Sequence, residues 1–142
     1  MYSKLFAEAR WKGAELHTLV TQELSPFCQD GVTSSRVEGP SLMLEPKVAQ
    51  AIAMTLHELA TNAAKYGALS VPNGHLHVEW SLTKNNQVAL RWTETGGPPV
   101  EPPTRKGFGT QLMKAMIGNQ LQGIIGFDWR ADGLMCEIAV RT

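Results

Sequence analysis

The apolar residues of the chain recur at helical spacing in three segments. The first reaches from the N-terminus to about Phe27, and the third runs from about Thr110 to Gln120. The middle segment, from Pro46 to about Ala68, has the clearest signals, because proline suits a first helical turn and Gly67 suits the exit. Its apolar residues lie three and four positions apart and predict one buried helix face, formed by Ala49, Ile52, Leu56, Leu59 and Ala63.

Alternating apolar and polar residues predict strands in most of the remaining chain. Turn residues separate the strands, with Gly39-Pro40 after the first, Asn85-Asn86 between the central pair and Asp132-Gly133 between the last pair. The predicted strands are Ser35–Glu38, Leu42–Leu44, His75–Thr83, Gln87–Thr93, Gly123–Arg130 and Leu134–Val140. Helices and mostly antiparallel strands in this order predict a two-layer α/β sandwich, in which the helices cover one face of the sheet.

Composition narrows the class of protein. With 142 residues, 43% hydrophobic and 18% charged, the chain suits one globular domain. Its 13 basic residues balance 13 acidic ones, which argues against a general electrostatic grip on nucleic acid or on an anionic membrane. The two cysteines, Cys28 and Cys136, favour a reducing compartment over a disulfide. Without a signal peptide or an apolar run of about 20 residues, we expect a cytoplasmic domain.

Polar residues form a stripe along the central predicted helix. Glu58, Asn62, Lys65 and Tyr66 stand at i, i+4, i+7 and i+8, beside the apolar face. A carboxylate and a carboxamide one turn apart can both offer oxygen to Mg²⁺. The lysine can reach a phosphate and the tyrosine can cover a flat ring. The alternative is a solvated helix face with an incidental polar pair.

Two further clusters flank the Gly/Pro-rich loop from Thr95 to Gly109. The first is the strand end at Glu94, where a carboxylate can accept a hydrogen bond from an adenine amine and the following glycines let backbone approach a ring. The second opens the C-terminal predicted helix, where free backbone N–H groups and neighbouring cations suit a phosphate. It comprises Arg105, Lys106, Gly107, Phe108, Gly109 and Thr110. Taken singly, each glycine cluster is more often only a turn.

Together the three clusters resemble the ATP-binding catalytic domain of the HWE family of bacterial sensor histidine kinases, within the GHKL (Bergerat-fold) ATPases. Segment 57–70 (HELATNAAKYGALS) is similar to the N box of that family. Segments 92–100 (WTETGGPPV) and 107–109 (GFG) are similar to its two glycine boxes. His57, Trp92 and Glu94 stand at the positions for which the family is named. The similarity extends from about Trp11 to the C-terminus.

The resemblance implies a role for each matched residue, with Mg²⁺ and ATP as cofactors. Asn62 would coordinate the Mg²⁺ that bridges the phosphates, with Glu58 assisting the metal or a water. Glu94 would read adenine, where other histidine kinases have aspartate. The residues between the glycine boxes would form a short ATP lid. Phosphate and pocket contacts would come from Lys65, Tyr66, Gly96, Arg105, Lys106, Gly107, Phe108, Gly109 and Thr110.

Other residues are open to two interpretations. His57 lies about 100° around the helix from Glu58, which favours a structural or hydrogen-bonding role over direct catalysis. Trp92 alternates with apolar residues and suits the core better than a cofactor platform. His75 and His77 share one strand face, but two histidines without a third ligand are more often surface residues.

The family's phosphoacceptor motif has no match, since Thr18 rather than arginine follows His17. We therefore expect residues 1–142 to be a single kinase catalytic domain without phosphoacceptor and sensor domains. Its partners would be a phosphoacceptor histidine on another domain or chain and a downstream response regulator. Two alternatives stay open: an ATPase with Glu58 as general base, and a nucleotide-binding module without catalysis.

Overall fold

The computed structural model describes residues 14–27, 34–98, 108–131 and 133–141. Its helices are α2 (Leu16–Leu24), α3 (Pro46–Tyr66) and α4 (Phe108–Lys114), with the short turns η1 (Ser25–Phe27), η3 (Ala68–Ser70) and the π-helical η4 (Ala115–Gln120). Its strands are β1 (Ala14–Glu15), β2 (Ser34–Glu38), β3 (Met43–Leu44), β4 (His75–Leu82), β5 (Gln87–Thr95), β6 (Ile124–Arg130) and β7 (Gly133–Arg141).

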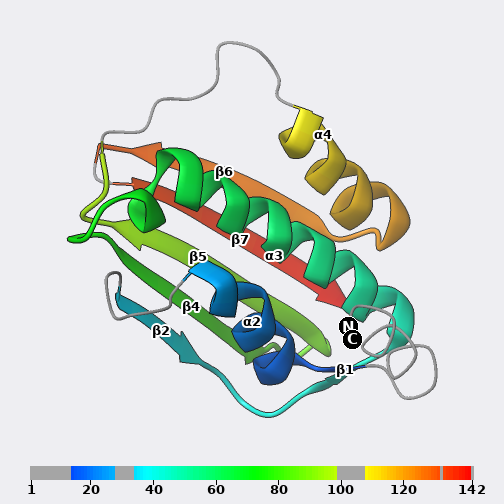
Figure 1. Cartoon of the computed structure of the whole chain (residues 1–142). Helices are drawn as coiled ribbons and strands as arrows, with labels where there is room; N and C mark the ends of the chain where they lie inside the picture. Colours follow the sequence, from blue (N-terminus) through cyan, green and yellow to red (C-terminus); the bar gives the residue numbers. More distant parts are fainter. Residues whose placement is uncertain (1–13, 28–33, 99–107, 132, 142) are drawn as a thin grey trace.

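Five strands form a mixed sheet in the order β2-β4-β5-β7-β6. The β4-β5, β5-β7 and β7-β6 pairs are antiparallel, whereas the edge strand β2 runs parallel to β4. The helices α2, α3 and α4 all lie on one face of this sheet (Figure 1). The chain therefore has the predicted two-layer α/β architecture, with a small β1-β3 pair beside it.

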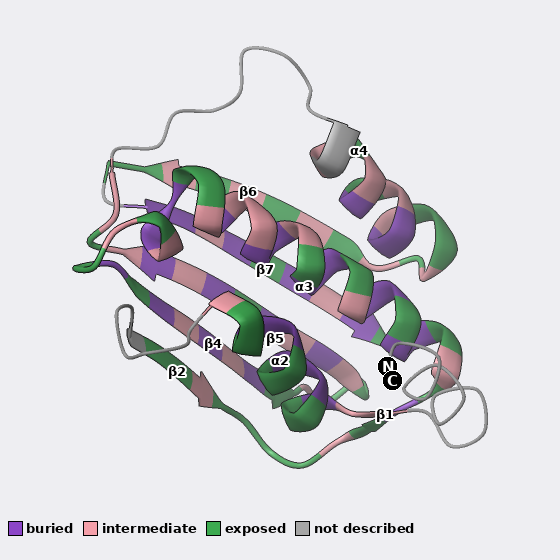
Figure 2. Cartoon of the chain, viewed as in Figure 1, coloured by how far each residue is buried: buried purple, intermediate pink, exposed green. Residues whose placement is uncertain are grey.

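The hydrophobic core fills the space between the two layers. The buried residues of α3 lie on the side that faces the sheet, and buried residues alternate along β4, β5 and β7 (Figure 2). The core includes Ile52, Leu56 and Leu59 from α3 and Val78, Leu90, Trp92, Cys136 and Ile138 from the sheet. This packing fixes the side chains that point inward from the central strands.

Most predicted elements are confirmed, with two differences. The first helix begins only at Leu16, because the Glu15 carboxylate accepts hydrogen bonds from the backbone N–H groups of His17 (2.9 Å) and Thr18 (3.1 Å) and caps it there. The predicted part before residue 14 lies outside the described residues. The C-terminal helix starts at Phe108 rather than Thr110 and widens from residue 115 into a π-helical turn.

The two strands on either side of Gly39-Pro40 do not pair with each other. The runs at Ser34–Glu38 and Met43–Leu44 are strands, but β2 pairs with β4 and β3 pairs with β1.

Within the described ranges, every helix is too short or too polar to serve as a membrane span.

Candidate functional site

The side chain of Glu94 is enclosed at the end of β5. It points toward the helix layer, on the same strand face as Trp92, and is 3% exposed. Its Oε1 accepts a hydrogen bond from the backbone N–H of Ala68 at 3.0 Å. Its Oε2 accepts one from the indole Nε1–H of Trp92 at 2.9 Å. The carboxylate is thus fixed where the end of β5 meets the turn after α3.

Close backbone packing allows Glu94 to reach this turn. A Cβ at Gly67 would overlap Oε1 of Glu94 and lie 3.2 Å from Cα of Ala63. On the strand side, a Cβ at Gly97 would lie 2.9 Å from the nitrogen and Cα of Ala68. In the described structure the close approach that these glycines permit is therefore between β5 and the connection that leaves α3.

The environment of Glu94 sets its proton affinity. Burial raises the pKa of the Glu94 carboxyl, while the hydrogen bonds from Trp92 and Ala68 lower it. A carboxylate oxygen has two lone pairs, and each oxygen here accepts one internal donor. Each oxygen therefore retains capacity to accept a hydrogen bond from a ligand.

The polar stripe of α3 lies on the helix that leads to this turn. Glu58 and Asn62 are half-buried, whereas Lys65 is exposed and Tyr66 is 68% exposed. Within the described part of the chain, no hydrogen bond or ion pair engages the side chains of Glu58, Asn62 or Lys65. Two oxygen-bearing side chains one turn apart are thus available to a hard cation.

The second predicted glycine cluster falls largely outside the described residues. Arg105, Lys106 and Gly107 belong to the undescribed segment, as does the predicted lid. Phe108, Gly109 and Thr110 form the first turn of α4. Their predicted contacts with phosphate stay predictions.

His57 points away from the polar stripe and contacts α2. Its Nδ1 lies 3.4 Å from Oε1 of Glu23, a side chain that is only 8% exposed. Burial raises the pKa of Glu23, and the neighbouring His57 lowers it. The contact joins the two helices at a distance from Glu94. Glu23 belongs to no motif that the sequence analysis identified. Its place on the inner side of an amphipathic helix was the one signal that could have indicated it.

We expect His57→Ala to weaken the domain most where Glu23 is ionised. Without the imidazole, the pKa of Glu23 rises further, so keeping that buried carboxylate ionised costs more. The loss of unfolding free energy relative to wild type should be about 1 kcal/mol larger at a pH where Glu23 is ionised than at a lower pH where it is protonated. Half-exposed His57 is screened by water, which limits the effect. Urea unfolding at both pH values measures it.

The pH difference isolates the ion pair, because any gain in helix propensity from alanine is independent of pH. Glu23→Gln provides the control, since His57→Ala added to it should show no such pH dependence. If His57→Ala costs the same at both pH values in wild type, as it should in the Glu23→Gln background, the pairing is contradicted.

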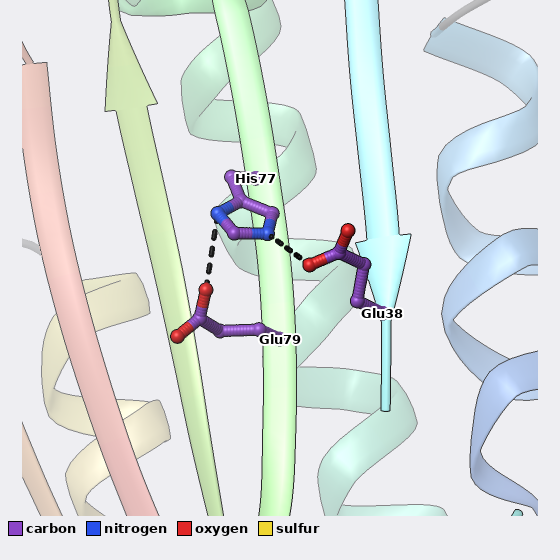
Figure 3. A group of neighbouring side chains, drawn as sticks. All are labelled: Glu38, His77 and Glu79. Carbon is purple, nitrogen blue, oxygen red and sulfur yellow. Dashed lines mark hydrogen bonds and ion pairs between the residues drawn. The ribbon is translucent and has the colours of Figure 1, made fainter. Parts of the chain in front are cut away.

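His77 lies on the opposite face of the sheet, between two carboxylates (Figure 3). Its Nε2 is 3.2 Å from Glu38 on β2, and its Nδ1 is 3.1 Å from Glu79 on β4. Arg36 also pairs with Glu38 at 2.6 Å. The hydrogen bond from His77 above all, with Arg36 adding to it, lowers the pKa of Glu38. Ligand atoms of the three residues lie within 4.8 Å of one another. Each ring nitrogen of His77 thus already faces a carboxylate within the cluster.

The outer face of the sheet also has an open hollow of about 390 Å³. Its lining residues include the small side chains Ser81, Ala89 and Ala139 and the ion pair of Arg91 with Glu137. Glu79 also lines it and contacts His77. The Glu94 carboxylate lies on the opposite, inner face of the sheet, toward the helix layer.

The chain is similar to known proteins in sequence and in fold. No protein-family model matches the chain. Over 131 residues it is 34% identical to a blue-light-activated histidine kinase of Brucella anthropi, covering 90% of this chain and 27% of that protein. A relative of the same name from Brucella ovis is 30% identical over 137 residues, covering 94% of this chain and 28% of its own length. The chain thus spans just over a quarter of these curated relatives.

Solved structures share the fold. The histidine kinase domain of the blue-light activated histidine kinase EL346 from Erythrobacter litoralis superposes with a TM-score of 0.77 at 15% identity, covering 93% of this chain and 63% of that one. Full-length ShkA in complex with AMPPNP gives 0.67 at 16% identity, covering 89% and 30%. Over nearly its whole length the chain is therefore similar to one region of these blue-light-activated histidine kinases, and it shares the fold of solved histidine kinase catalytic domains.

Proposed function

We propose that this domain binds Mg²⁺·ATP between the C-terminal half of α3 and the end of β5. It then presents the γ-phosphoryl group to a histidine on another domain or chain, and a response regulator is the downstream acceptor. The observation that carries this proposal is the environment of Glu94. Two internal donors fix this buried carboxylate, and its oxygens can still accept further hydrogen bonds. The AMPPNP complex of the structurally similar ShkA supports a nucleotide as the ligand.

The residues present fit both parts of the ligand. Glu94 would accept a hydrogen bond from the adenine amino group, and Lys65 and Tyr66 would lie beside the nucleotide. Asn62 and Glu58 would hold Mg²⁺ through their side-chain oxygens, the donor type that this cation prefers. When bound, Mg²⁺ neutralises phosphate charge, and positioning by the protein supplies most of the remaining rate enhancement.

Removal of the metal tests this assignment. Titration with AMPPNP in the presence of Mg²⁺ should give saturable binding in a calorimeter, and the same titration with EDTA should lose at least about tenfold in affinity. GMPPNP, which offers a carbonyl instead of the amino group, should bind weakly in both cases because it places an acceptor against Glu94. Equal affinity for the two nucleotides would contradict the role of Glu94.

A second candidate is ATP hydrolysis with Glu58 as general base. In its favour, this half-buried carboxylate has no partner in the described ranges and is available to a water. Turnover measured with and without a phosphoacceptor domain separates the two functions. Phosphate release by the isolated domain at an undiminished rate would favour the ATPase, whereas phosphorylation that requires the acceptor supports the kinase.

A further inference from the structure

The structure assigns Trp92 as a positioning residue: its indole N–H, together with the Ala68 amide, fixes the Glu94 carboxylate for recognition of an adenine amino group. Trp92 contacts Glu94 rather than the nucleotide, so it acts through that carboxylate. This inference deepens the proposed function and rests on it.

The indole is rigidly placed by the core. Trp92 is fully buried in β5, between its ladder partners Val78 on β4 and Cys136 on β7. Residues i and i+2 of a strand share one face, which brings the ring beside the Glu94 side chain. The bond from Nε1 to Oε2 is 2.9 Å and lies inside the protein. A hydrogen bond to a charged acceptor in such a site is stronger than one in water.

The two donors explain why this position has glutamate. Trp92 binds one oxygen from the strand side, and Ala68 binds the other from the turn after α3. An aspartate at residue 94 would withdraw the carboxylate by one C–C bond, about 1.5 Å, and both hydrogen bonds would lengthen. Tryptophan at position 92 and glutamate at position 94 therefore act together as one hydrogen-bonded pair.

The indole also acts on the charge of Glu94. An ionised carboxylate has only hydrogen-bond acceptors, whereas a protonated carboxyl group also has an O–H donor. Loss of the Trp92 donor removes a contribution that lowers the pKa, so Glu94 protonates at higher pH. The described residues packed around Glu94 include one titratable side chain, that of Cys136 on β7. The others are Leu76 on β4, Gly133 on β7, and Gly67 and Ala68 after α3. Burial above all, with Glu137 and Glu94 adding to it, raises the pKa of the Cys136 thiol to about 12, so it stays neutral.

The chain provides a matched control in Trp80. Its indole is also buried in the core, and its Nε1–H donates to the carbonyl of Pro40 at 2.8 Å, far from Glu94. Trp92→Phe and Trp80→Phe each remove one indole hydrogen bond and a similar volume. AMPPNP affinity of both variants is measured with Mg²⁺ by calorimetry from about pH 5 to about pH 8.

Trp92→Phe should bind AMPPNP about tenfold more weakly near neutral pH. Its loss of affinity on acidification should begin at higher pH than in wild type. Trp80→Phe should keep the wild-type pH profile. If Glu94→Gln is introduced first, Trp92→Phe should have little further effect on affinity, because the carboxylate through which Trp92 acts is absent. Equal effects of Trp80→Phe and Trp92→Phe, or full additivity with Glu94→Gln, would overturn the inference.

A measurement on the unmodified protein covers the case in which Trp92→Phe does not fold. The NMR signal of the Trp92 indole N–H should shift with pH as Glu94 titrates, while that of Trp80 should not follow the same transition. An unresponsive Trp92 signal would overturn the positioning role. Absence of AMPPNP binding by wild type, with the indole titration intact, would instead overturn the proposed function alone.

Discussion

Asn62→Ala is expected to abolish Mg²⁺-dependent nucleotide binding while leaving the domain slightly more stable. Asparagine is a poor helix former, and Asn62 lies in the last third of a 21-residue helix. In the described structure no hydrogen bond of its side chain offsets that preference. Alanine should therefore raise the unfolding free energy by about 0.5 kcal/mol. Lost binding in such a variant is attributable to the missing carboxamide.

Gln50→Ala is the matched control for Asn62→Ala. It removes a carboxamide from an exposed position of the same helix, about two turns before Glu58, where the polar stripe begins. AMPPNP affinity, measured by calorimetry with Mg²⁺ and with EDTA, should fall at least about a hundredfold for Asn62→Ala and stay at the wild-type value for Gln50→Ala. Unchanged Mg²⁺ dependence in Asn62→Ala would exclude this residue as a metal ligand.

Gly67→Ala has the second large expected effect, and its cause is steric. The φ of Gly67 is −117°, which alanine adopts without strain. The added Cβ, however, would overlap Oε1 of Glu94. Glu94 would have to leave its position and lose the hydrogen bond from Ala68. We expect a loss of about 2 kcal/mol in unfolding free energy, together with weaker AMPPNP binding.

Two comparisons identify the source of that loss. Gly118→Ala introduces a Cβ that meets no atom within 4 Å, so thermal unfolding should change little or shift upward. Glu94→Ala removes the side chain that collides, so Gly67→Ala should cost much less in that background. The same loss with and without Glu94 would show that the steric account is wrong.

Local patterns predicted the elements that local forces decide. Segment 46–68 has proline at its start, glycine at its exit and one apolar face, and α3 occupies Pro46–Tyr66. Alternation around Asn85-Asn86 similarly predicted β4 and β5, because hairpin register follows from the turn between the strands. The polar stripe of α3 follows from the same periodicity, which places Glu58 and Asn62 side by side.

Contacts between distant segments were beyond such patterns. The parallel pairing of β2 with β4 depends on a crossover through α3, which no short motif encodes. The partner of His57 is a glutamate on another helix, and Ala68 donates to Glu94 through a backbone N–H, a group that every residue except proline has. Trp92 was expected in the core, where it lies, but its hydrogen bond depends on the direction of one ring.

The arrangement around Glu94 links ligand binding to the cooperativity of folding. The carboxylate depends on the end of β5, on a turn 26 positions away along the chain, and on close contact with Gly133 at the start of β7. Partial unfolding of any of these segments removes the carboxylate from its place. A nucleotide that binds only the assembled site therefore contributes its binding free energy to the stability of all three segments at once.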